Sequence, residues 1–243
     1  MRLRFRFRPI PLIATILLVA LGIALGNWQE RRAAGKIALR DRIAQQSTQP
    51  PLDLGPSTIP PEFRHVRLTG QFMPGWPVFM DNRPYQGRSG FYLLMPFKIA
   101  GAETYVLVAR GWLPADPKVH DRRPSYATPA GPATIEGTVR SDLGHVLQLG
   151  TAAPLKPGAI VQNVTPVQFA QASGLPLQPF FIEQTGPKEQ GDALVRDWPL
   201  PSTGIETHQG YALQWYGLAT MAFLFFVITG FRSGSKHDDP GPR

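Results

Sequence analysis

Two long uncharged apolar segments lie near the ends of the chain, at residues 10–26 and 211–231. The first has 17 residues. As a helix it would extend roughly 26 Å at about 1.5 Å per residue, which is just enough to cross a slightly thin bilayer. The second contains Trp215 and Tyr216 near its start, and such side chains favour the membrane–water interface. Each segment therefore predicts a membrane-spanning helix.

The first apolar segment has a second interpretation, a cleaved signal peptide. Four arginines precede it, and Ala-Leu-Gly at 24–26 resembles a small-residue cleavage site. The segment is longer than the ~7–15 residues of a usual signal-peptide core. Residues 29–46 contain no proline and are rich in Ala, Arg, Gln and Leu, which favours a continued helix. We therefore predict a retained anchor with a helical extension into water.

Between the apolar segments, short strand-like patterns alternate with connections rich in proline and glycine. The chain has 26 Pro and 24 Gly, too many for a helical bundle. Prolines between 50 and 61 indicate an extended linker, and residues 110–114 look like a strand end that turns sharply. One helix is expected, with Thr165 as N-cap and Gly174 at its end. Strands are predicted over residues 64–72, 78–80, 91–97, 104–108, 134–139, 160–164 and 180–183, the third and fourth placed to pair as a hairpin.

These elements predict a membrane α + β protein. Two transmembrane helices, one near each terminus, would flank a small mainly antiparallel β domain with one short helix. The expected boundaries are a basic tail at 1–9, the first transmembrane helix at 10–27, its helical extension at 28–47, the β domain at 48–209, the second transmembrane helix at 210–231 and a C-terminal tail at 232–243.

The formal net charge of +8 is concentrated in the tails. Four arginines precede the first apolar segment, and three basic against two acidic residues follow the second, so the tails carry +5. Basic tails predict that both termini are cytoplasmic and that the central domain is periplasmic. The absence of an Arg- and Ser-rich presequence favours a bacterial inner membrane. No basic block with interleaved aromatics occurs in the middle, so a nucleic-acid partner is not expected.

Little in the chain points to an enzyme. There is no cysteine, which excludes disulfides, thiolate metal sites and a cysteine nucleophile. No nucleotide-binding or hydrolase motif occurs, and the histidines lack metal-site spacing; they are His65, His120, His145, His208 and His237. A membrane-tethered enzyme would need a cluster of reactive residues in the β domain.

His208 lies just before the second apolar segment, with Tyr211 and Trp215 one and two turns deeper. A neutral imidazole there is able to ligate haem iron, with the aromatic rings packed on the macrocycle. The alternative is an ordinary interfacial histidine without a ligand. Trp28 and Gln29, at the end of the first apolar segment, are by themselves typical of an interfacial anchor.

Several short motifs occur in order along nearly the whole chain. They are L-G-N-W-Q-E-R-R-A-A-G-K at 25–36, V-R-L-T-G-Q-F at 66–72, D-N-R at 81–83, G-R-S-G-F at 87–91, V-A-R-G-W-L-P at 108–114 and G-I-E-T-H-Q-G-Y-A-L-Q-W-Y-G-L-A at 204–219. As an ordered set they resemble the surfeit-locus-one (Shy-type) family of cytochrome c oxidase assembly proteins. One departure is Ala109, where the family pattern has Asn.

The resemblance implies assembly rather than catalysis. Family members support insertion of haem a into oxidase subunit I, and bacterial members are proposed to bind haem a. Carried over by position, His208 would be the axial ligand of the haem iron, and Trp28 and Gln29 would face it across the paired helices. Tyr211 and Trp215 would pack on the macrocycle. Arg32 and Lys36 would pair with the haem propionates.

The partners that the resemblance implies are cytochrome c oxidase subunit I, haem a synthase and the lipid bilayer. The absence of cysteine agrees with a haem role rather than copper delivery, which usually needs soft sulfur ligands. An alternative function is a membrane scaffold that holds subunit I or haem a synthase without binding haem.

Overall fold

The computed structural model describes residues 4–5, 9–119, 121–148, 150, 154–186, 192–200 and 204–232. The chain divides into two compact units, Met1–Asp41 with Pro201–Arg243, and Arg42–Leu200. Most of the predicted tails at 1–9 and 232–243 lies outside the described residues, as do His120 and His237.

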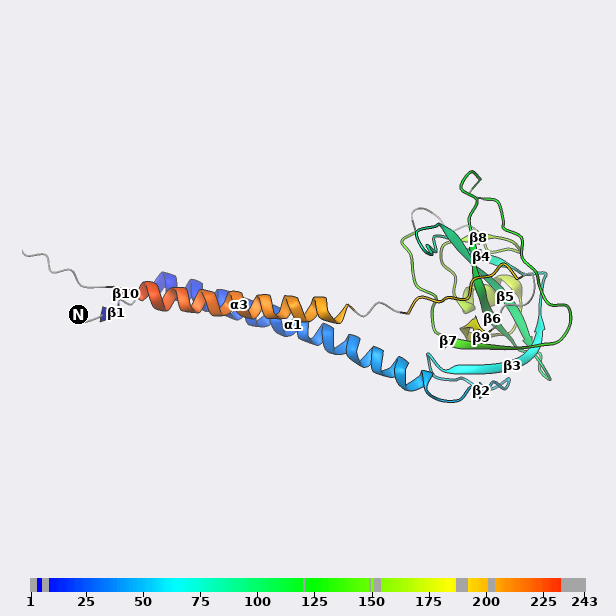
Figure 1. Ribbon diagram of the computed structural model, residues 1–243, viewed down its shortest axis with the longest axis horizontal. Coiled ribbons are helices and arrows are strands. Elements are labelled where there is room, and N and C mark those ends of the chain that lie inside the picture. Colours follow the sequence, from blue (N-terminus) through cyan, green and yellow to red (C-terminus); the bar gives the residue numbers. More distant parts are fainter. Residues whose placement is uncertain are drawn as a thin grey trace, which may run out of the picture. The chain divides into compact units, whose positions relative to one another are not determined.

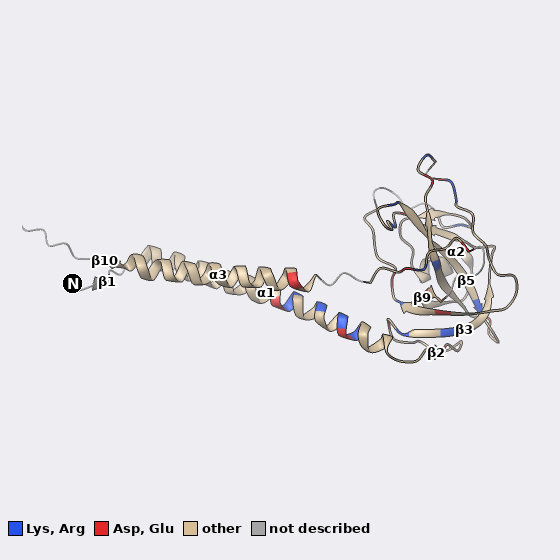
Figure 2. Cartoon of the chain, viewed as in Figure 1, with Lys and Arg blue, Asp and Glu red and all other residues tan. Residues whose placement is uncertain are grey.

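Two long helices dominate the first unit (Figure 1). Helix α1 spans Pro9–Ser47 and helix α3 spans Ile205–Gly230, and both are long and apolar enough to cross a membrane. Helix α1 runs without a break into the predicted extension, and its charged residues all follow Trp28 (Figure 2). Helix α3 begins ahead of the predicted start at 210, so His208 lies in its first turn. Outside the helices, β1 (Arg4–Phe5) pairs antiparallel with β10 (Phe231–Arg232).

The two long helices pack along a narrow seam of small residues. The buried residues of α1 are spaced alternately by four and three positions, and most of those of α3 recur every seven. This spacing is typical of antiparallel helices that pack with a shallow crossing angle. The buried positions are Gly22, Gly26, Gln29 and Ala33 on α1, and Ile205, Ala212, Ala219 and Gly230 on α3.

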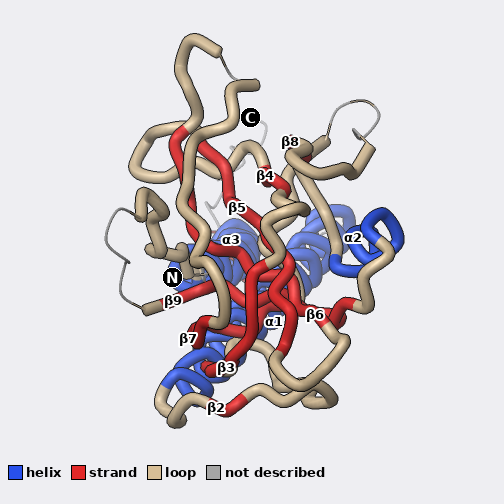
Figure 3. Tube along the Cα trace, turned by 90° about the vertical axis from the view of Figure 1, so that its right-hand side faces the viewer, coloured by secondary structure: helices blue, strands red, loops and turns tan. Residues whose placement is uncertain are grey.

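In the described part of the second unit, eight strands form one sheet. Its order is β2-β3-β7-β9-β6-β5-β4-β8, and an added β3–β5 pairing closes five of the strands into a small barrel. Figure 3 shows these strands wrapped around one another. The strands are β2 (Leu52–Asp53), β3 (His65–Phe72), β4 (Val78–Met80), β5 (Gly90–Ile99), β6 (Tyr105–Pro114), β7 (Ala133–Arg140), β8 (Ile160–Val161) and β9 (Leu177–Thr185).

Most of the predicted elements of the β domain are confirmed. All seven predicted strands are present, and β5 and β6 form the expected antiparallel hairpin. Helix α2 (Pro166–Ser173) has the expected cap: Thr165 accepts a hydrogen bond from the backbone N–H of Gln168, and Gly174 ends the helix with a φ of 72°. Among the described strands of this sheet, most pairs are antiparallel, but β2–β3, β4–β8 and β6–β9 are parallel.

The prediction of a sharp turn at 110–114 is wrong, because β6 continues to Pro114. The ladder with β5 shifts register between Leu93 and Leu94, so that Arg110 becomes an extra residue on its strand. The Arg110 side chain is buried, lies over the Phe72 ring at 4.5 Å and donates to the carbonyl of Ala127. A bulge thus accommodates the motif without ending the strand.

Two apolar clusters account for most of the β-domain core. One fills the barrel with alternate residues of β3, β5, β6, β7 and β9, including Leu68, Phe97 and Ile182. The other covers the outer face of β5 and β6, where Phe169 of α2 and Trp112 pack. Successive side chains of a strand point to opposite faces, so β5 and β6 bury residues both inside the barrel and on its outer face.

A buried ion pair lies between β7 and β9. Arg140 Nη1 is 2.8 Å from Glu183 Oε1, and the two side chains are only 13% and 8% exposed. Burial raises the pKa of the Glu183 carboxyl, while Arg140 acts in the opposite direction. The guanidinium of Arg140 also lies over the Phe63 ring.

Candidate functional site

A histidine and a glutamine meet across the seam between α1 and α3. His208 lies in the first turn of α3, and its Nδ1 is 2.8 Å from Oε1 of Gln29. Gln29 is 9% exposed and occupies one of the buried seam positions of α1, while His208 is half-buried. The contact joins residues that are 179 positions apart in the chain. The structure therefore brings together two of the predicted site residues.

The contact fits the tautomer of His208 in which Nδ1 carries the proton. In that tautomer Nδ1 donates to the amide oxygen of Gln29, which only accepts hydrogen bonds, and Nε2 keeps its lone pair. Among the described residues, no group hydrogen-bonds Nε2. Histidines that ligate metals are oriented in this way, with one ring nitrogen held by an acceptor and the other left for the metal. His208 and Gln29 thus fit the ligation of a haem iron.

The other predicted site residues lie on the same two helices, without a direct contact to this pair among the described interactions. Trp28 is 45% exposed, and the guanidinium of Arg32 lies over its ring at 5.4 Å. Tyr211 is 49% exposed and Trp215 is half-buried. These side chains offer aromatic surface and one cation, a composition that suits a flat, anionic ligand.

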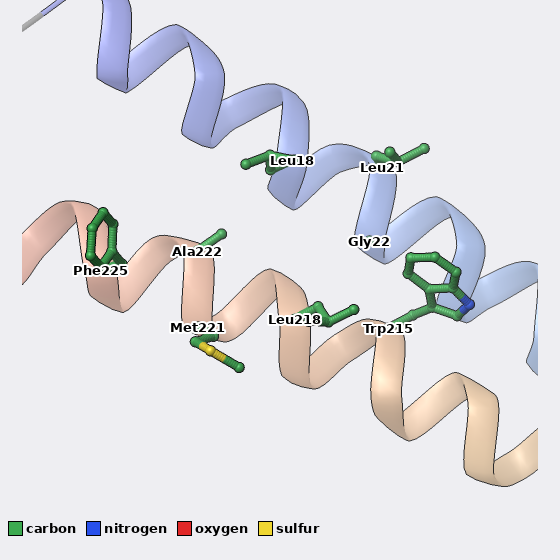
Figure 4. A pocket seen from close by; sticks show the side chains of 8 residues that line it. All are labelled: Leu18, Leu21, Gly22, Trp215, Leu218, Met221, Ala222 and Phe225. Carbon is green, nitrogen blue, oxygen red and sulfur yellow. The ribbon is translucent and has the colours of Figure 1, made fainter.

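An apolar groove of about 390 Å³ lies between the same two helices (Figure 4). Trp215 projects toward α1 at one end of it, opposite Gly22. All eight lining residues are apolar: Leu18, Leu21, Gly22, Trp215, Leu218, Met221, Ala222 and Phe225. Of these, only Trp215 is among the residues predicted for the site. The recurrent spacing of glycine and alanine on both helices is the signal in the sequence that indicates close packing.

The absence of a side chain at Gly22 allows the two helices to approach closely. A Cβ atom at this position would lie 2.9 Å from the Cβ of Ala219 and 3.0 Å from the carbonyl oxygen of Trp215. Because one of these atoms is backbone, a side chain cannot be accommodated by a rotamer change alone. We expect Gly22→Leu to separate the helices and to break the contact between His208 and Gln29.

The matched control for this change is Gly35→Leu, since Gly35 lies on the same helix with no atom within 4 Å of its added Cβ. The chain has no cysteine, so spin labels attached at Ile23→Cys and Leu213→Cys would report the distance between the helices. An unchanged distance in Gly22→Leu would contradict the packing argument.

The motif residues of the β domain hold the fold together. Arg83 is buried and donates to the carbonyls of Gly144 and Gln162, and its own carbonyl accepts a hydrogen bond from Trp112 Nε1 at 2.7 Å. The motifs at 81–83 and 108–114 therefore interlock. Among the described residues, no group of three or more His, Cys, Asp or Glu is placed to hold a metal ion.

Comparison with known proteins agrees with the motifs. The family model described as "SURF1 family" matches residues 16–220. A SURF1-like protein of Rickettsia felis is 27% identical over 224 residues, which cover 85% of this chain and 90% of the relative. A SURF1-like protein of Rickettsia bellii is 28% identical over 235 residues, which cover 89% of this chain and 88% of the relative.

A relative in Saccharomyces cerevisiae, named cytochrome oxidase assembly protein SHY1, is 33% identical over 104 residues. That match covers 41% of this chain and 27% of the yeast protein. The family match covers α1 from residue 16, the whole β domain and α3 as far as residue 220. The chain belongs to the SURF1 family.

Proposed function

We propose that this protein is an assembly factor for a haem–copper cytochrome c oxidase, and that it holds haem a between α1 and α3 for insertion into subunit I. The observation that carries the proposal is the hydrogen bond between His208 and Gln29 at the seam of two apolar helices. Membership of the SURF1 family and the name of the yeast relative support the role in oxidase assembly.

Each site residue has a role in this proposal. His208 ligates the iron through Nε2, and Gln29 keeps the imidazole in the required tautomer and orientation. Trp28, Tyr211 and Trp215 pack against the macrocycle. Arg32, already placed over the Trp28 ring, pairs with a propionate, because a guanidinium forms strong charge-assisted hydrogen bonds with carboxylates.

We also propose that the protein is an inner-membrane protein of a bacterium, with both termini in the cytoplasm and the β domain in the periplasm. The basic residues of the two terminal tails, before the first apolar segment and after the second, support this orientation. His208 and Gln29 would then lie at the periplasmic end of the helix pair. Subunit I and haem a synthase are the proposed partners, and the β domain is a binding module rather than a catalyst.

Deletion of the gene is expected to lower the a-type haem signal and the cytochrome c oxidase activity of membranes together. The physical reason is that subunit I without its haem lacks the redox centre on which its activity depends. A reduced-minus-oxidised spectrum and an oxygen-consumption assay measure the two quantities. Both should return when the wild-type gene is restored.

An unchanged spectrum and activity in the deletion strain would count against a role in oxidase assembly. The scaffold function makes a different prediction, namely that oxidase assembly survives substitution of His208. A strain that carries only the His208→Ala protein separates the two, since the haem-handling proposal requires it to behave like the deletion strain.

A further inference from the structure

The apolar groove continues the face of the helix pair on which His208 lies. Trp215 and Ala222 follow His208 at intervals of seven residues, and both line the groove. Residues seven apart lie on nearly the same face of a helix. Trp215 is therefore reached from His208 by moving roughly 10 Å along α3, without leaving that face.

Other residues that line the groove are also seven or fourteen positions from residues of the proposed haem site. Leu218 and Phe225 of the groove are seven and fourteen residues after Tyr211. On α1, Leu21 of the groove is seven residues before Trp28, and Leu18 is fourteen before Arg32. The side chains proposed to contact the macrocycle and those that line the groove thus form one strip along one flank of the seam.

The strip has opposite chemistry at its two ends. Arg32 and His208 stand at the polar end, and the groove beyond Trp215 is lined only by apolar side chains. A matching ligand has a metal and anionic groups at one end and a long hydrocarbon chain at the other. Haem a and haem o have this form, because each carries a hydroxyethylfarnesyl chain where haem b has a small vinyl group.

We propose that the groove receives the isoprenoid chain of the haem, so that the protein selects farnesylated haems over haem b. The inference rests on the proposed function, since it uses His208 as the ligand. Lipid tails are as apolar as the groove, so apolarity alone does not select the occupant. The isoprenoid chain has the advantage of attachment to a macrocycle already held at His208, which raises its effective concentration at the groove.

Substitution of Ala222 offers a way to fill the groove while leaving His208, the proposed iron ligand, unchanged. It is half-buried and lines the groove two turns beyond Trp215. The full-length protein, reconstituted in lipid nanodiscs, would be titrated with haem a, haem o and haem b and followed by absorbance. Wild type is expected to bind haem a and haem o more tightly than haem b. Ala222→Phe is expected to weaken the first two about tenfold, because an added ring overfills the space, and to leave haem b unchanged.

The matched control is Ala20→Phe, the same substitution at an exposed position of α1 outside the groove, which should change none of the three affinities. Equal affinities of the wild-type protein for haem o and haem b would overturn the inference and identify the groove as a site for lipid chains or a partner helix, while the proposed function stands. An Ala222→Phe protein that loses all three haems equally, or none, would overturn it as well. Failure of wild type to bind any haem would overturn both the inference and the haem-binding part of the proposed function.

Discussion

Replacement of His208 by alanine is expected to abolish haem a binding by the purified protein. The imidazole supplies the proposed axial ligand through Nε2, and alanine has no group that can replace it. The helix pair should remain assembled, because its packing depends on the small residues Gly22, Gly26, Ala212 and Ala219. The absorbance of bound haem after reconstitution measures the loss.

His145→Ala is the matched control, since His145 is exposed on a loop of the β domain.

Substitution of Gln29 tests the orienting contact by itself. Gln29→Leu is expected to weaken haem binding by about 10- to 100-fold, as is usual for the acceptor behind a ligating histidine. Gln29→Glu keeps an acceptor oxygen and should retain most of the affinity. Equal haem content in wild type and His208→Ala would disprove ligation by His208.

Substitution of Glu183 by alanine is expected to destabilise the β domain by about 3–5 kcal/mol. The change would leave the guanidinium of Arg140 buried without its counter-charge, and the side chain of Arg140 is only 13% exposed. The raised pKa of Glu183 shows that burial already disfavours its charged form despite Arg140. The expected loss of stability therefore comes mainly from the unpaired cation that remains buried. The intact ion pair itself makes only a small net contribution.

Glu136→Ala is the control for this change. Glu136 pairs with Arg67 at the same 2.8 Å, but both side chains are more than 40% exposed. Pairs in such solvated positions contribute about 0–1 kcal/mol. Urea unfolding of the full-length protein in detergent, followed by tryptophan fluorescence, compares the two variants, since three of the five tryptophans lie in the β domain. Equal losses of unfolding free energy would mean that burial does not set the cost.

The elements of this protein were largely readable from local patterns. Seventeen uncharged residues at 10–26 are long enough to predict a helix, and alternation with Gly and Pro boundaries is enough to predict most strands. The helix at Pro166–Ser173 was identifiable from Thr165, Pro166 and Gly174, because capping depends on neighbours in the sequence. His208 and Gln29 were singled out through the motifs around them.

Long-range relations were decided only by the tertiary structure. The β3–β5 pairing that closes the barrel and the parallel β6–β9 pair depend on which edges meet after folding. The bulge at Arg110 depends on the space offered by Phe72 and Ala127, which lie far from it in the sequence.

The hydrogen bond from His208 to Gln29 and the groove beside it have the same origin. Both arise where α1 and α3 pack, and that packing depends on which faces of two distant helices match. By itself the sequence determined the helices, most strands and the candidate ligand, because those signals lie within a few residues of one another. The tertiary structure alone decided the contact of His208 with Gln29, the closure of the barrel and the groove, because each needs segments that meet only when the chain is folded.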